Sequence, residues 1–289
     1  PSLDAILPCT SDCFVGARPK TQCLDIAHAL QTVIEKGLDM HGSSAIAQGD
    51  VEKYYDSLPV LSIIQWLCSK GVPAAAAMSL LRHQMLPKVV LRCGSKTVEV
   101  PNRSIGGLTG SRVAGFLGRI PVESTIAERR LHWKRHGFHT DTAVFCLCTW
   151  VDNIYSASDT LSGAIGILED FEMHLQKRWR MHIKASSRSC MVALGSSGVP
   201  HDADKWPLVD TFAVLGHLLQ NDGSVRACWS AAKVGMWKAF WGNSGAPAAK
   251  CLTSRERLRL LKRTVTPTFD YRCSRWPPQQ QIACELDAL

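Results

Sequence analysis

Apolar and polar positions along this chain follow two different periods, one typical of helices and one typical of strands. In residues 21–37 apolar side chains recur every three or four positions, which predicts a helix with one buried face. Gly37 is suited to end this helix. A short apolar piece then stops near Asp50 and predicts a strand followed by a turn. The periodic positions of the helix are Cys23, Ala27, Leu30 and Ile34.

Two prolines mark the next helices. Pro59 and Pro73 each predict the start of a helix, because proline is suited to the first helical turn, and the second of these helices is rich in alanine. β-Branched runs on both sides of Gly94-Ser95 then predict a β-hairpin. The chain therefore mixes helices and short strands in its first half.

A second hairpin has a single acid at its tip. An apolar run begins at Val144, a β-prone run ends at Ser158, and Asp152-Asn153 lies between them. Asp159 is a candidate cap for the long helix that follows. The apolar face of that helix is Leu161, Ile165, Leu168, Phe171 and Leu175, and a further strand is predicted at residues 189–195.

The pattern changes near residues 198–206, which resemble a linker. Residues 211–224 predict either a pair of strands or a strand and a turn, and two helical segments follow at roughly 225–241 and 254–265. The second segment is preceded by the capping box Thr253-x-x-Glu256. This order predicts an α+β body followed by a mostly helical C-terminal part.

Length and composition narrow the class of protein. The 289 residues suffice for two domains or one elongated domain, and a hydrophobic fraction of 46% is that of a folded chain. No run of eighteen apolar residues occurs, so no membrane span is predicted. Because the first residue is Pro1, we expect a segment of a longer chain.

Basic residues outnumber acidic ones by 33 to 25, which favours a polyanionic partner where the excess is clustered. Two clusters stand out, at residues 177–188 and 255–263; the alternative is that each is an ordinary solvated helix face. Trp179 lies within the first cluster and could contact nucleic acid. The four-residue spacing of Trp237 and Trp241 instead favours core packing.

Twelve cysteines raise the question of a metal site. No C-x-x-C pair occurs, and the one group that could supply four zinc ligands has spacings that match no standard site. Buried thiols in a reducing compartment are therefore the favoured interpretation. The four residues of that group are Cys9, Cys13, Cys23 and His28.

Two acids have a context that suggests chemistry. Asp50 ends a predicted strand, and Asp152 lies in a hairpin turn about a hundred residues later. If the two strands are neighbours, both carboxylates project from one sheet edge and can bind divalent cations for phosphoryl transfer. The alternative is a pair of unrelated surface aspartates.

The order of segments along the chain resembles the palm of a reverse transcriptase, most closely the non-LTR (LINE-type) retroelement and group II intron enzymes. QGDVEKYYDSLP (48–59) resembles the family motif DxxKAFDxV, and CTWVDNIYSAS (148–158) takes the place of the YADD hairpin. GGLTGSRVAGFLG (106–118) stands where the family has GxxQGxxLSPxLF.

Flanking segments extend this resemblance over nearly the whole chain. VGARPKTQCLDIAHAL (15–30) is similar to the fingers motif GFRxGRSxxDxI. LEDFEMHLQKRWRMHIKASSRS (168–189) resembles the helix and GLxINxxKS strand that follow the YADD hairpin, and FAVLGHLLQNDGS (212–224) resembles the FxYLGxxL primer grip. The basic C-terminal helices are similar to a thumb.

The resemblance implies an α+β fold: a right-hand polymerase palm with an antiparallel sheet and packed helices, partial fingers and a C-terminal helical thumb. Residues 1–200 would form the partial fingers and palm, and residues 201–289 the primer grip and thumb-like region. The implied activity is RNA-directed DNA polymerisation by a retrotransposon-type enzyme. It would add dNTPs to a DNA primer on an RNA template by two-metal phosphoryl transfer, with no membrane partner.

The resemblance also assigns residues. Asp50 and Asp152 would be catalytic, binding two Mg²⁺ ions, or Mn²⁺ as an alternative, with the Val51 carbonyl and Asn153 as further ligands. The implied nucleotide-binding residues are Tyr55, which would exclude a 2′-hydroxyl, Thr109, Gly110 and Arg188. The implied nucleic-acid contacts are Arg18, Lys177, Arg178, Arg255, Arg259 and Lys262.

Departures from the family pattern keep other functions open. Asn153 replaces the second acid of the hairpin, Thr109 replaces a glutamine, and Arg188 takes the place of a lysine that protonates pyrophosphate, which arginine does poorly. The family's first fingers strand is also not found in the sequence. One alternative is a catalytically inactive relative that only binds nucleic acid. Another is an unrelated basic α+β interaction protein, in which Asp50 and Asp152 would lie far apart.

Overall fold

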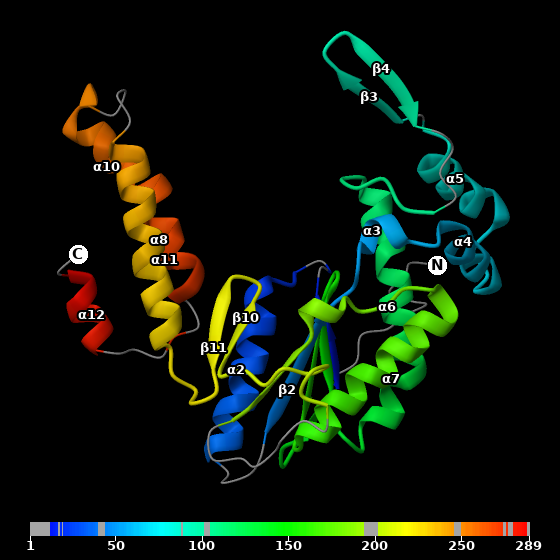
Figure 1. The fold of residues 1–289 in the computed structure, drawn as a ribbon, viewed down its shortest axis with the longest axis horizontal. Coiled ribbons are helices and arrows are strands. Elements are labelled where there is room, and N and C mark those ends of the chain that lie inside the picture. Colours follow the sequence, from blue (N-terminus) through cyan, green and yellow to red (C-terminus); the bar gives the residue numbers. More distant parts are fainter. Residues whose placement is uncertain are drawn as a thin grey trace.

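The computed structural model is an α+β protein built on a five-stranded sheet (Figure 1). The structure describes residues 12–16, 18, 20–39, 44–87, 89–100, 105–193, 202–245, 250–273, 276 and 280–287. The strands are β1 (Cys13–Val15), β2 (Ala45–Asp50), β3 (Val89–Cys93), β4 (Lys96–Val100), β5 (Phe138–His139), β6 (Val144–Phe145), β7 (Leu147–Trp150), β8 (Asn153–Ser158), β9 (Ser189–Val192), β10 (Thr211–Val214) and β11 (His217–Gln220). The helices are α2 (Cys23–Asp39), α3 (Tyr54–Ser57), α4 (Val60–Ser69), α5 (Ala74–Met85), α6 (Arg112–Trp133), α7 (Leu161–Trp179), α8 (Arg226–Ser244), α10 (Ser254–Thr264), α11 (Thr266–Cys273) and α12 (Gln280–Asp287), with a 3₁₀ turn at Ala185–Ser187.

The central sheet has the strand order β1-β7-β8-β2-β9. The pairs β7–β8, β8–β2 and β2–β9 are antiparallel, as expected, whereas the edge pair β1–β7 is parallel. Since β7 and β2 run in the same direction, β1 and β2 are parallel strands joined through α2. A helix is the usual connection between parallel strands, which accounts for the one departure from the expected antiparallel sheet.

Both faces of the sheet are buried. Successive side chains of β2 alternate between them, so that Ala45 and Ala47 join a core formed with α4, α6 and α7, while Ile46 joins a second core formed with α2 and the β10–β11 hairpin. The helical face predicted for residues 21–37 is confirmed, because Ile26, Leu30 and Ile34 are buried in this second core. Helices therefore cover the sheet on both sides, as Figure 1 shows.

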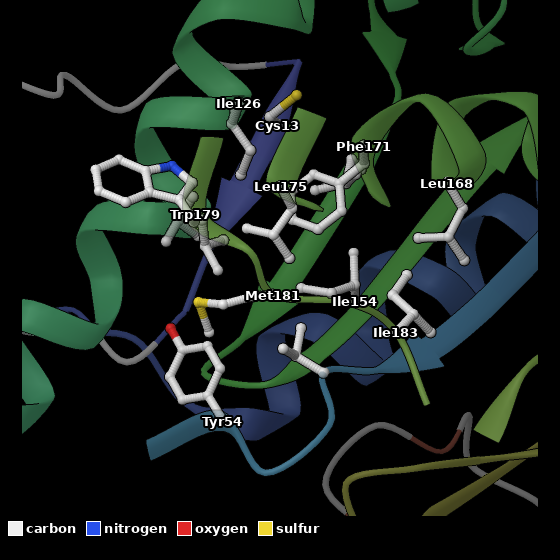
Figure 2. Packing of buried hydrophobic residues seen from close by; sticks show 14 of the residues in the cluster. Cys13, Tyr54, Ile126, Ile154, Leu168, Phe171, Leu175, Trp179, Met181 and Ile183 are labelled. Atoms are coloured by element: carbon white, nitrogen blue, oxygen red, sulfur yellow. The ribbon is translucent and has the colours of Figure 1, made fainter. Parts of the chain in front are cut away.

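Helix α7 provides much of the first core. Figure 2 shows Leu168, Phe171 and Leu175 packed into the same cluster as Ile154 of β8, and the predicted apolar face of this helix is confirmed. The predicted cap is wrong: Thr160, not Asp159, is the N-cap, and its Oγ1 accepts a hydrogen bond from the Gly163 amide at 3.1 Å.

Asp159 has a different partner. Its carboxylate accepts a hydrogen bond from the His139 amide at 3.0 Å, and so it anchors β5 to the end of β8. The apolar run that begins at Val144 is also divided. Val144 and Phe145 pair with β5, the Cys146 amide donates to the Asp12 carbonyl at 2.9 Å, and β7 starts only at Leu147.

Most other expected elements are present. The hairpin around Gly94-Ser95 is formed by β3 and β4, and residues 211–220 form a pair of antiparallel strands, which decides between the two alternatives for that segment. The capping box of Thr253 and Glu256 is confirmed at the start of α10. The linker expected at 198–206 begins outside the described residues.

Two groups of elements flank the sheet (Figure 1). Helices α8, α10, α11 and α12 stand on one side, and α4, α5 and the β3–β4 hairpin stand on the other. The C-terminal part thus has four helices of eight or more residues in the ranges described, where the periodicity predicted two. Strand β2 runs toward α3, on the side of the sheet from which both groups project.

In the described part of the chain, no helix is long and apolar enough to cross a membrane.

The packing of α7 can be tested by truncating one of its buried side chains. Leu168 has no exposed surface, so Leu168→Ala should lower the free energy of unfolding by about 2–5 kcal/mol through lost contacts and a new cavity. Met173 on the same helix is 54% exposed, and Met173→Ala should change the free energy by less than about 0.5 kcal/mol. Urea denaturation followed by circular dichroism measures both. Equal effects would contradict the packing of α7 described above.

Candidate active site

The structure brings together the two acids that the sequence separates by about a hundred residues. Asp50 is the last residue of β2, and its partner across the antiparallel ladder is Asn153, the first residue of β8. The amide of Val51 donates a hydrogen bond to the Asp152 carbonyl at 2.9 Å. Asp50 and Asp152 therefore meet where the two central strands β2 and β8 adjoin, at one end of these strands, as the resemblance requires. An arrangement with the two acids far apart is excluded.

The turn that presents Asp152 is tight. Trp150 and Asn153 are paired, so only Val151 and Asp152 connect β7 to β8. Val151 has a φ of 57°, a left-handed conformation that crowds a β-branched residue. Such conformations cost on the order of 1–3 kcal/mol and persist only where the surrounding structure enforces them. The ladder on both sides of the turn thus holds Asp152 in place at an energetic cost.

The charge of Asp152 acts on the carboxylate of Asp50. The pKa of Asp50 is raised above its ordinary value, first by partial burial and then by the negative charge of Asp152, while Lys184 acts in the opposite direction. Burial and the charge of Asp152 also raise the pKa of Tyr55. Asp152 is therefore close to both Asp50 and Tyr55, and the site is an acidic pair with a lysine beside it.

Asn153, which replaces the family's second acid, bonds directly to Asp152. Its amide nitrogen donates to Asp152 Oδ1 at 3.0 Å. A carboxylate at this position would be a third negative charge in the same place, whereas the neutral amide gives Asp152 a hydrogen-bond donor. The amide oxygen of Asn153 is the atom that would be left to act as a ligand.

These donors suit a hard divalent cation. Carboxylate, amide and carbonyl oxygens are the ligands that Mg²⁺ uses, and Mg²⁺ commonly takes only one or two protein carboxylates and completes its shell with water and phosphate oxygens. In the described ranges no group of three or more His, Cys, Asp or Glu side chains is placed to hold a metal. A cation at this end of the strands would therefore depend on Asp50 and Asp152, with neutral oxygens from Asn153 and Val51.

The glycine-rich turn expected to contact the nucleotide is anchored next to Tyr55. The Gly107 amide donates to the Tyr55 carbonyl at 2.7 Å, and a Cβ on Gly106 would lie 2.9 Å from the Asp56 carbonyl oxygen. Thr109 and Gly110 are exposed at the end of this turn, and Gly110 has a φ of 87° that favours glycine. The start of the turn is thus fixed next to Tyr55, and the nucleotide contacts of Thr109 and Gly110 stay predictions.

Three side chains near the site were missed by sequence reasoning. Gln84 is fully buried, and its Oε1 accepts from the Leu108 amide at 2.8 Å, which fixes the glycine-rich turn. The Ser187 hydroxyl accepts from the Asp50 amide at 2.9 Å, and Lys184 lies close enough to lower the pKa of Asp50. In the sequence, Lys184 is one cation of the first basic cluster, and no local pattern distinguishes Gln84 or Ser187 as part of a site.

Two basic residues assigned to ligands are engaged inside the protein. The Arg18 side chain is only 10% exposed and pairs with the buried Glu123 at 2.8 Å, and Glu123 also pairs with Arg119. Arg188 donates from Nη2 to both carboxylate oxygens of Glu172, at 2.7 and 2.8 Å. Direct contacts of Arg18 and Arg188 with nucleic acid or nucleotide stay predictions, and both would have to compete with these ion pairs.

The first basic cluster spans the last turn of α7 and the segment that follows it. Lys177 and Arg178 are exposed, and Arg178 pairs with Glu128. The suggestion that Trp179 contacts nucleic acid is wrong, because Trp179 is 2% exposed and packs edge-on against Trp66 in the first core. It lies on the covered face of α7, one helical turn after Leu175.

The second basic cluster lies on α10, a helix that has no buried residue. Arg255, Arg259 and Lys262 are all exposed, as a role in binding a backbone requires. The expectation of core packing for Trp237 and Trp241 is wrong. Trp241 is 65% exposed and its ring stacks on that of Trp237, because the helices next to α8 cover a different part of its surface.

The interpretation of the cysteines as buried thiols holds for only part of them: five of the eleven described cysteines are buried, and four are exposed. Of the group considered for zinc, Cys9 lies outside the described residues, Cys13 is buried in β1, and Cys23 and His28 belong to α2. A hydrogen bond with the Cys146 thiol, followed by burial, raises the pKa of Cys13 above its ordinary value. Cys13 is therefore a buried core thiol, 1% exposed.

No protein-family model and no curated protein matches this sequence. Solved structures do match the fold. Telomerase from Candida tropicalis in complex with a TWJ fragment of telomeric RNA is 10% identical with a TM-score of 0.54, over 93% of this chain and 45% of the telomerase chain. Telomerase from Candida albicans in complex with the same kind of fragment gives 0.51 at 10% identity, over 91% and 45%.

Apo telomerase from Candida tropicalis gives a TM-score of 0.52 at 9% identity, over 86% of this chain and 45% of the other. The chain thus spans less than half the length of these structures. At such low identity the similarity defines the fold and not the activity. The fold is that of these telomerase structures, an α+β fold of the reverse-transcriptase-like type, and the similarity does not by itself indicate the non-LTR or group II type.

Proposed function

We propose that this chain is part of an RNA-directed DNA polymerase of the non-LTR retroelement or group II intron type. It would extend the 3′-hydroxyl of a DNA primer with dNTPs on an RNA template. The observation that carries the proposal is the meeting of Asp50, at the end of β2, and Asp152, just before β8, within a reverse-transcriptase-like fold.

The residues of the site fit the roles that this reaction needs. Asp50 and Asp152, with the Asn153 amide oxygen and the Val51 carbonyl, would hold two Mg²⁺ ions. Bound Mg²⁺ neutralises phosphate charge and activates the attacking hydroxyl. Phosphoryl transfer needs little more from the protein than positioning and charge. The half-exposed ring of Tyr55 next to Asp152 supports a place for it against the sugar of the nucleotide.

Exposed basic residues support a nucleic-acid partner. Helix α10 displays Arg255, Arg259 and Lys262 without burying any residue, which suits a helix that follows a phosphate backbone. The telomerases with the same fold were solved in complex with telomeric RNA fragments. We extend RNA binding to this chain as part of the proposal.

A catalytically inactive relative that binds nucleic acid is the second candidate. Asn153 favours it, because its amide donates to Asp152 where the family has a third negative charge. With two carboxylates instead of three, the affinity of the site for cations would be lower. The two candidates differ in whether Asp50 and Asp152 support primer extension.

The metal role of the acids can be tested without activity. At pH 7 and without metal, Asp50→Asn should raise the Tm by about 1–3 °C, a small gain because water screens the repulsion from Asp152. Since the pKa of Asp50 is raised, its ionisation opposes folding. The gain is therefore expected at neutral pH and should shrink as the pH falls through the pKa of Asp50.

Added Mg²⁺ should raise the Tm of the unmodified chain and have little effect on Asp50→Asn, because a bound cation stabilises only a fold that binds it. Asp141→Asn is the matched control: Asp141 is exposed in the turn between β5 and β6, so this variant should keep the full response to Mg²⁺. An equal response in Asp50→Asn would contradict a metal site at this end of the strands.

Primer extension tests the reaction itself. On an RNA template with Mg²⁺ the chain should extend a DNA primer, Asp152→Ala should abolish extension, and Asp141→Ala should not. Asn153→Asp restores the family's acid. Extension by both the unmodified chain and Asn153→Asp would show that Asn153 is a tolerated ligand. Extension by Asn153→Asp alone would identify an inactive relative, and extension that survives Asp152→Ala would refute the proposed site.

Neutralising α10 should weaken binding to an RNA–DNA duplex regardless of its sequence. Each lost phosphate contact should reduce the slope of log K against log salt by about 0.7–0.9, so the loss of three contacts should reduce it by about 2–3. The α10 variant carries Arg255→Gln, Arg259→Gln and Lys262→Gln. The control variant carries Lys36→Gln on α2, together with Lys70→Gln and Arg135→Gln, which are exposed just after the ends of α4 and α6. Fluorescence anisotropy across a salt series measures both; equal slopes would remove α10 from the interface.

A further inference from the structure

The segment Ile183–Arg188 holds the backbone of Asp50. The Lys184 amide donates to the Asp50 carbonyl at 2.8 Å, and the Asp50 amide donates to the Ser187 hydroxyl at 2.9 Å. Ser187 in turn donates to the Lys184 carbonyl at 2.7 Å, which closes the segment on itself. The position of the Asp50 carboxylate therefore depends on where this segment lies.

One acid on α7 fixes both ends of the segment. Glu172 Oε1 accepts from the Ile183 amide at 3.0 Å, and both oxygens of Glu172 accept from Arg188 Nη2 at 2.7 and 2.8 Å. The two side chains are only 13% and 15% exposed, so water screens the ion pair less than it would at the surface. The Arg188 guanidinium also lies 5.8 Å from the ring of the buried Trp206.

This geometry assigns to Arg188 a role that its place in the sequence does not suggest. In the sequence, Arg188 takes the position of a family lysine that acts on the leaving pyrophosphate. In the structure, its guanidinium instead forms an ion pair with Glu172 of α7. Lys184 is the cation whose charge reaches Asp50. Lys184 is also exposed, and so it is free of the constraint on Arg188.

We infer that Glu172 and Arg188 are positioning residues, which clamp the 183–188 segment to α7 and thereby hold Asp50 in place for metal binding and catalysis. The clamp itself is a property of the fold, while its catalytic consequence rests on the proposed polymerase function. Neither residue has to touch a substrate for this role.

Amide hydrogen exchange tests the clamp without any activity. Glu172→Gln and Arg188→Gln should each speed exchange at the amides of the 183–188 segment and of Asp50. The double variant should show no more than the larger single effect, because both changes remove one interaction. Lys205→Gln is the matched control. It breaks a 2.6 Å ion pair with Glu169, one turn earlier on α7, and should leave these amides unchanged.

Primer-extension kinetics test the consequence. In Glu172→Gln and Arg188→Gln the kcat should fall by about 10- to 100-fold, because a carboxylate displaced by around an ångström loses the productive geometry. The KM for dNTP should stay within about twofold, since no nucleotide contact is lost. A raised KM with unchanged kcat in Arg188→Gln alone would place Arg188 on the nucleotide and overturn the inference.

The two tests separate the inference from the proposed function. If the unmodified chain does not extend primers but both variants speed exchange at Asp50, the polymerase proposal fails and the clamp stands. If exchange at Asp50 is unchanged in both variants, the clamp is refuted whatever the activity. If exchange speeds up while kcat is unaffected, the clamp exists but does not position catalysis, and the inference is overturned.

Discussion

The pairing of β2 with β8 is the constraint on which the rest of the site depends. The ladder runs in continuous register from Ala45 opposite Ser158 to Asp50 opposite Asn153. A shift by one residue would turn every β2 side chain to the other face, so that Ile46 would exchange cores with Ala45 and Ala47. Because both faces are buried against different helices, the core permits one register only. The same register sets Asp50 beside the Asp152 turn.

The site and the core have opposite effects on stability: the buried core stabilises the fold, whereas the site destabilises it. Partial burial and the nearby charge of Asp152 raise the pKa of Asp50, and Val151 is held at a positive φ in the turn between β7 and β8. Both features cost stability, and neither would persist without the buried ladder and α7 behind it. The Asn153 amide reduces this conflict by donating to Asp152. A place where a protein keeps like charges together is where a cation would bring the largest gain.

The fold also separates basic residues that look alike in the sequence. Arg18 and Arg188 form ion pairs with Glu123 and Glu172 and are mostly buried, whereas Arg255 and Arg259 are exposed on a helix that buries nothing. A run of cations therefore does not define a binding surface. Whether a cation is available to a ligand depends on its partners inside the protein, and these partners come from other elements of the fold.

The sequence by itself determined the elements and their order. Hydrophobic periodicity located α2, α7 and the hairpins to within a few residues, because burial of one face imposes a local pattern. The resemblance also singled out Asp50 and Asp152 before their distance was known. Caps and strand boundaries depend on contacts outside the segment itself. Thr160, and not Asp159, is the N-cap of α7, and the carboxylate of Asp159 instead accepts a hydrogen bond from the amide of His139.

Tertiary structure alone decided which faces are covered and which polar groups meet. Trp179 is buried and Trp241 exposed, although spacing and charge suggested the reverse, because exposure depends on neighbouring helices rather than on the helix itself. The roles of Gln84, Ser187 and Glu172 also come only from the fold, since each acts on a backbone group distant in sequence. Periodicity is a local property that one segment can reveal. A hydrogen bond across a hundred residues exists only once the chain has folded.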